Sequence, residues 1–106
     1  MASLDLGVRF SATSSGAGDF VSFGPVTGYR DLSALMNGKI YRYRAESPDL
    51  TQWEYGSGRV SGGNTIARAN VKYSSTGSKV SFSVAPQVAV SIDPDDVLQF
   101  DDAMSL

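Results

Sequence analysis

The chain contains no cysteine and no histidine among its 106 residues. Without cysteine no disulfide framework can form, so the fold depends on packing or on the assembly of several copies. Zinc sites built on thiolate or imidazole are excluded. So are the Cys/His and Ser/His/Asp arrangements of nucleophilic catalysis, because the activating base is missing. These absences favour a non-enzymatic protein without a cofactor.

Long apolar runs are also missing. Residues 1–10 alternate between apolar and polar side chains, unlike the continuous apolar core of a secretory signal. Nowhere does the chain approach the roughly 20 apolar residues of a membrane-spanning helix. We therefore expect a soluble protein that is made in the cytoplasm and has no membrane partner. The apolar fraction of 42% is typical of a folded chain, and the length suits one domain covering residues 1–106.

Charge is unevenly distributed along the chain. The net charge is −2, but residues 93–106 contain five aspartates and no lysine or arginine, which leaves +3 for the rest. Such a segment suits contact with a neighbouring copy or a basic partner, although a solvated acidic terminus explains it equally well. The candidate interface residues are Arg42, Arg44, Asp93, Asp95, Asp96, Asp101 and Asp102.

Most of the chain has the two-residue periodicity of β-strands, in which alternate side chains face opposite sides. Turn signals such as Asn37-Gly38 separate the segments. We predict an all-β fold, a small single-domain β-sandwich or barrel-like fold. The expected strands cover residues 4–10, 20–23, 39–46, 65–73, 80–84 and 88–92, and a further strand opens at residues 53–55 and is bent or bulged at residues 56–58.

Two short helical segments are also expected. Residues 31–36 combine a capping aspartate with helix-compatible side chains, but the stretch is barely two turns long. Near the C-terminus, Asp93 suits the N-cap and Pro94 the first helical position, so we predict a short C-terminal helix. Capping accounts for Asp93, Asp95 and Asp96 better than calcium binding does, because the spacing of a calcium loop is absent.

Three catalytic or ligand-binding interpretations rest on weak patterns. Asp49 and Glu54 are the carboxylate pair near aromatic side chains that glycoside hydrolysis could use, but nothing in the sequence sets their separation. The neighbours Ser78-Lys79 occur in a serine-rich turn, where such pairs arise by chance. The pair Gly56-x-Gly58 lacks the third glycine and the following helix of a nucleotide site.

The run Tyr41-Arg42-Tyr43-Arg44 interleaves aromatic and basic side chains, as do platforms for single-stranded nucleic acid. Strand alternation, however, sends the tyrosines to one face and the arginines to the other. We therefore expect tyrosines in the core and arginines at a rim or subunit interface, with no nucleic-acid partner.

Several short motifs follow one another in a fixed order between residues 20 and 92. A glycine turn and an aromatic strand ending in Ala-Glu precede a Trp-Glu-x-Gly-x-Gly step, an Asn-Thr-Ile-Ala-Arg strand, a Ser-Ser turn and a Val-Ser-Phe strand. This order resembles a module of tailed-bacteriophage virion proteins, especially tail fibres, head fibres and related appendages. The sequence departs from it after Val84, where Ala85-Pro86-Gln87 replaces an expected glycine turn. The key motif residues are Trp53, Glu54, Gly56, Gly58, Asn64, Arg68, Ser74 and Ser75.

The resemblance implies a non-enzymatic virion structural protein, a capsid decoration, head-spike or tail-fibre-type component that acts through protein–protein contacts. It implies capsid or tail proteins as partners, a place on the virion after synthesis in the host bacterium, and a homotrimer. Bulky side chains on both faces of residues 65–73 fit such assembly.

Each motif residue also suits a purely structural role. Trp53 can anchor the core, Gly56 and Gly58 permit a bulge, and Arg68 can clamp Glu54 or a backbone carbonyl. The alternative function, from another class, is a carbohydrate-binding module that recognises a host glycan through Trp53 and the nearby tyrosines.

Overall fold

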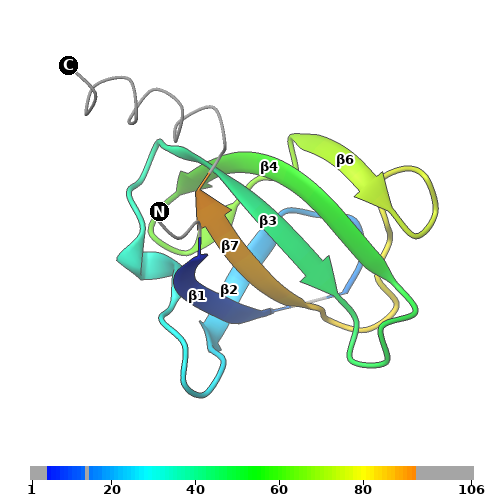
Figure 1. Cartoon of the computed structure of the whole chain (residues 1–106), viewed down its shortest axis with the longest axis horizontal. Helices are drawn as coiled ribbons and strands as arrows, with labels where there is room; N and C mark the ends of the chain where they lie inside the picture. Colours follow the sequence, from blue (N-terminus) through cyan, green and yellow to red (C-terminus); the bar gives the residue numbers. More distant parts are fainter. Residues whose placement is uncertain (1–4, 14, 93–106) are drawn as a thin grey trace.

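The computed structural model describes residues 5–13 and 15–92, and it confirms the predicted all-β fold (Figure 1). One short 3₁₀-helix, η1 (Leu32–Ala34), interrupts the strands. The expected C-terminal helix and the five tail aspartates lie in residues 93–106, outside the described residues. The strands are β1 (Asp5–Ala12), β2 (Phe20–Pro25), β3 (Ile40–Glu46), β4 (Trp53–Ser61), β5 (Thr65–Ile66), β6 (Asn70–Ser74) and β7 (Gln87–Ile92).

The strands form one antiparallel sheet that closes on itself. The order is β3-β7-β1-β2-β5-β4-β6, and an additional ladder joins β3 directly to β4. A circuit of six strands therefore returns to its start, which gives the barrel-like form expected from the sequence. Strand β6 continues along the edge of β4 that β5 occupies further on. Figure 1 shows β7 between β3 and β1, with β6 outside β4.

The core consists of the inward-facing side chains of these strands. On β3 the alternation is complete, since Tyr41, Tyr43 and Ala45 are buried while Arg42 and Arg44 stay on the outer face. The predicted separation of tyrosines and arginines is confirmed. The other large buried side chains are Val8, Phe10, Phe20, Leu32, Val60, Ile66, Val80, Phe82, Val88 and Val90.

Three of the expected elements differ from the structure in extent or in kind. Residues 65–73 are two strands rather than one, because the chain leaves the sheet between them where Arg68 turns inward. Residues 80–84 are not a strand, because side chains bind the backbone of Val80 and Phe82 makes only an isolated bridge with Gly16. The helix at 31–36 is a single 3₁₀ turn in which only Leu32 is buried, too little to stabilise two α-helical turns.

Candidate functional site

The motif residues Glu54 and Arg68 form a buried ion pair. Both side chains are 0% exposed, and two parallel hydrogen bonds join them, 2.9 Å from Nε to Oε2 and 2.5 Å from Nη2 to Oε1. The clamp expected from the sequence is therefore present. Such a bidentate pair fixes the relative orientation of the guanidinium and carboxylate planes. The interaction is therefore strong, and its geometry is specific.

The same pair ties together segments that are distant in the sequence. The Val80 N–H donates to Glu54 Oε1 at 2.8 Å, and Arg68 Nη2 donates to the Val80 carbonyl at 2.5 Å. Arg68 Nη1 donates to the carbonyls of Gly16 and Gly18, each at 3.2 Å. Because each of these polar groups has a partner, the pair can be buried without an uncompensated charge. We call Glu54, Arg68 and these partners the clamp.

The clamp lowers the pKa of Glu54. Burial by itself would raise the pKa of this carboxyl group, but hydrogen bonds from Arg68, the Tyr43 hydroxyl and the Val80 N–H, with the attraction of the guanidinium, outweigh it. Burial and the adjacent Glu54 carboxylate raise the pKa of Tyr43, so its hydroxyl stays a donor. The clamp therefore has one stable charge arrangement near neutral pH.

The two motif glycines allow the chain to cross closely over β4. A Cβ on Gly58 would lie 1.6 Å from the carbonyl oxygen of Ala67, and one on Gly56 would lie 2.5 Å from that of Asn70. Strand β6 also carries one extra residue, Lys72, between its pairings with Tyr55 and Gly56. The bulge therefore lies in β6, opposite Tyr55 and Gly56, and not at residues 56–58 of β4, where we expected it. The glycines of β4 serve the close crossing instead.

Trp53 lies at the start of β4 on the outer face and is not the core anchor expected from the sequence. It is partly buried, and its ring meets that of Tyr55 edge-on at 5.8 Å. The other motif residues lie at turns: Ser75 binds the Trp53 backbone, the Ser74 hydroxyl donates to the Ser78 carbonyl, and the Asn64 carbonyl accepts from Ser22. These contacts are structural.

A row of paired residues crosses the outer face of the sheet. In the ladders Tyr73 lies opposite Tyr55, Tyr55 opposite Arg44, Arg44 opposite Ala89, and Ala89 opposite Arg9. Directly paired residues project to the same side. Arg44 of β3 is therefore joined by tyrosines from other strands, which the periodicity of β3 alone could not reveal.

Contacts within this row hold the arginines in place. The Arg44 guanidinium lies 4.7 Å from the centre of the Tyr55 ring. Glu46 accepts from Arg9 Nη2 at 2.5 Å and from Arg44 Nε at 2.9 Å. The hydrogen bond from Arg9 is the largest influence on the pKa of Glu46. Together with the hydrogen bond from Arg44 and the charges of both arginines, it holds this pKa below its usual value although burial opposes it. Glu46 thus neutralises part of the positive charge of Arg9 and Arg44.

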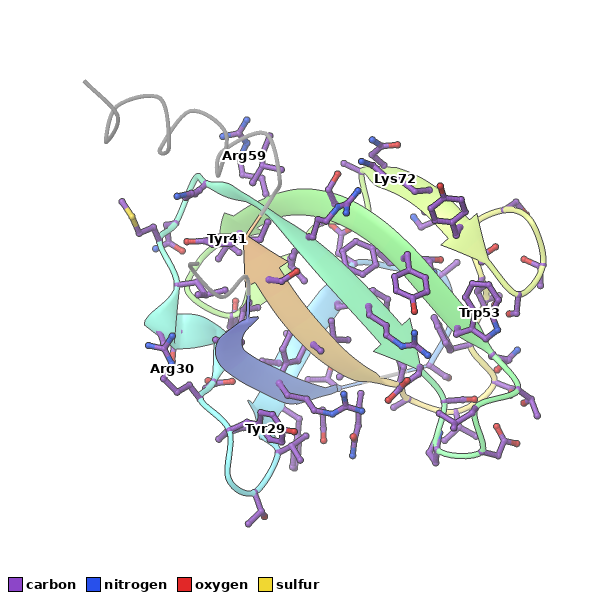
Figure 2. All side chains as sticks on the ribbon, in the orientation of Figure 1. Tyr29, Arg30, Tyr41, Trp53, Arg59 and Lys72 are labelled. Atoms are coloured by element: carbon purple, nitrogen blue, oxygen red, sulfur yellow. The ribbon has the colours of Figure 1, made fainter. Side chains whose placement is uncertain are left out.

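Two hollows open on this face, of about 310 Å³ and 440 Å³, and they adjoin because Arg42, Tyr43 and Tyr55 line both. Lys72 and Tyr73 complete the first hollow, while Tyr29 lies at the far side of the second. Figure 2 shows Lys72 beside β6 and Tyr29 beyond β1. We call this surface the basic face, defined by Arg9, Tyr29, Arg42, Arg44, Tyr55, Lys72 and Tyr73.

The structure does not assemble the catalytic patterns considered from the sequence. Glu54 is fully buried in the clamp, whereas Asp49 lies in an exposed loop and accepts from Ser47 and Thr51. Within the described part of the chain, no hydrogen bond joins the Ser78 hydroxyl to Lys79. The proposed calcium ligands lie outside the described residues, and residues 5–13 and 15–92 contain no cluster of metal-ligating side chains.

No helix among the described residues has the length and apolar character needed to cross a membrane. Comparisons with protein-family models, with curated proteins and with solved structures find no match to this chain.

Proposed function

We propose that the chain is a non-enzymatic structural protein of a tailed phage or phage-like particle, where it decorates the capsid or forms part of a head spike or tail appendage. The observation that carries the proposal is the clamp. The residues that resemble the appendage module, Glu54, Gly56, Gly58 and Arg68, are all buried and build one scaffold. A shared scaffold leaves the outer surface free to differ between partners.

The basic face is the surface on which this proposal places the contacts. It combines arginine and tyrosine side chains, two residue types that are enriched at protein interfaces. Capsid or tail proteins are the proposed partners, the homotrimer is the proposed assembly, and the virion is the proposed location after synthesis in the bacterial cytoplasm. The proposal requires no cofactor.

Particle association tests this function directly. Phage particles from a lysate of the source bacterium are separated on a density gradient, and the fractions are probed with an antibody against the chain. The chain should sediment with the major capsid protein and resist release by washing. If it remains at the top of the gradient while intact particles sediment, the structural assignment is wrong.

A carbohydrate-binding module is the second candidate, favoured by one observation. Trp53 lies on the outer face against Tyr55, next to the hollow that Tyr55 and Tyr73 line. Aromatic rings beside a concavity can stack on sugars. A glycan array with the full chain tests this. Signals lost in Trp53→Ala but kept in Tyr29→Ala support it, whereas the absence of any glycan-dependent signal removes it.

A further inference from the structure

The cations of the basic face are unequally neutralised. Arg9 and Arg44 share Glu46, whereas Arg42 and Lys72 have no carboxylate partner in the described part of the chain. No acidic side chain among the described residues lines either hollow. Two cations beside tyrosine rings are therefore available to an anionic partner.

The shape of the basic face suits an extended segment better than a single small ion. The hollows run across five neighbouring strands, from Tyr73 on β6 to Arg9 on β1, and small side chains such as Ala89 and Ser91 form part of their floor. The cations lie along this path rather than around one point. A ligand with several negative charges in sequence would meet each of them in turn.

The chain itself contains a segment of that chemistry. Residues 93–106 carry five aspartates and no cation, and apolar side chains such as Leu98 and Phe100 are interspersed among them. Carboxylates complement Arg42 and Lys72, and apolar side chains complement the tyrosine rings. Fourteen residues span at most about 46–50 Å when extended, enough to cross several strands of a neighbouring molecule.

We propose that residues 93–106 of one copy dock on the basic face of a second copy. This docking rests on the proposed function, because it would be the contact through which copies of the structural protein assemble. Each copy then offers one acidic segment and one basic face, which are different surfaces. Contacts between two different surfaces close into a ring when the rotation permits. A ring of three is the homotrimer proposed above.

The direct test is binding of a labelled peptide with the sequence of residues 93–106, measured by fluorescence anisotropy. The receptor is the full chain with its own tail neutralised by Asp93→Asn, Asp95→Asn, Asp96→Asn, Asp101→Asn and Asp102→Asn. We expect binding that weakens with added salt and weakens at least about tenfold when Arg42→Glu and Lys72→Glu are added. Addition of Arg59→Glu and Lys79→Glu, two exposed cations outside both hollows, should have a much smaller effect.

Each alternative gives a different result. Absence of peptide binding, or binding that Arg42→Glu with Lys72→Glu does not weaken, overturns the proposal. If the peptide binds but the wild-type chain stays at 11.2 kDa at every concentration, the tail docks on its own molecule and the second copy is wrong. Tighter binding of a single-stranded oligothymidylate than of the peptide identifies a nucleic-acid surface instead. Thermal unfolding of each variant checks that it is folded, and particle sedimentation tests the proposed function independently.

Discussion

Arg68 joins several segments that are distant in the sequence. Its side chain binds Glu54 and the carbonyls of Gly16, Gly18 and Val80, and its guanidinium lies 4.6 Å from the centre of the Phe20 ring. The sequence predicted the pairing with Glu54 because both residues belong to one run of motifs. A backbone carbonyl was the expected alternative to Glu54, but the sequence could not show that Arg68 binds both, or which carbonyls it reaches, since backbone groups carry no signature in a sequence.

The substitution Arg68→Met should lower the free energy of unfolding by about 3–5 kcal/mol, because the buried carboxylate of Glu54 then loses its partner. Urea denaturation followed by the fluorescence of Trp53 measures this. The matched control is Arg59→Met, the same change at an exposed arginine, for which we expect no more than about 0.5 kcal/mol.

Arg68→Met can be too unstable to study, because a domain of this size has roughly 5–15 kcal/mol in total. The double variant Glu54→Gln/Arg68→Met removes the unpaired charge while keeping an acceptor for Tyr43. It should be more stable than the single variant. A single variant within about 1 kcal/mol of the wild type would show that the clamp contributes little to folding.

The free energy of unfolding should depend on pH through the carboxylates of Glu54 and Glu46. The pKa values of Glu54 and Glu46 are lowered on folding from an ordinary value of 4.5, so the unfolded chain binds their protons more readily. Their contribution is complete above about pH 4.5 and is lost as the pH falls through the folded values. Denaturation curves between pH 7 and pH 3 should show this decline, and Glu46→Gln should make it shallower. A free energy of unfolding that is flat over this range contradicts the assignment.

At the level of elements, alternation predicted the strands that pair along their whole length, of which β3 is the clearest. It failed at residues 80–84, where Val80 and Phe82 are buried as expected but Val84 is 55% exposed. The Val80 backbone bonds to the side chains of Glu54 and Arg68, and Phe82 makes only an isolated bridge with Gly16, so no continuous strand ladder forms. The basic face was only half visible in the sequence, because Arg44 meets Tyr55, and Tyr55 meets Tyr73, through strand pairing.

The crossing of the chain over β4 gives a prediction of its own. In Gly58→Ala the new methyl group would lie 1.6 Å from the Ala67 carbonyl oxygen, so the backbone must shift. We expect a loss of at least about 1–3 kcal/mol in the free energy of unfolding. Gly18→Ala is the control, because a Cβ there meets nothing within 4 Å. Equal stability of the two variants would place the crossing elsewhere.

At the scale of the whole molecule, the proposed contact joins two different surfaces, the acidic segment of residues 93–106 and the basic face. Each surface can therefore be removed in a separate variant. Arg42→Glu/Lys72→Glu keeps the acidic tail and loses the face. The variant with five tail asparagines keeps the face and loses the tail. Each should remain a monomer of 11.2 kDa in light scattering, because neither can both offer and receive the contact.

Mixing the two variants restores one complete contact and no more. The mixture should therefore form a one-to-one complex of twice the monomer mass and stop there, while the wild-type chain closes into a trimer. High salt should dissociate both assemblies, since the screening length falls from about 10 Å at 0.1 M to about 3 Å at 1 M. Assembly of either variant alone, or a mixture that stays monomeric, would show that the copies meet through another surface, if they meet at all.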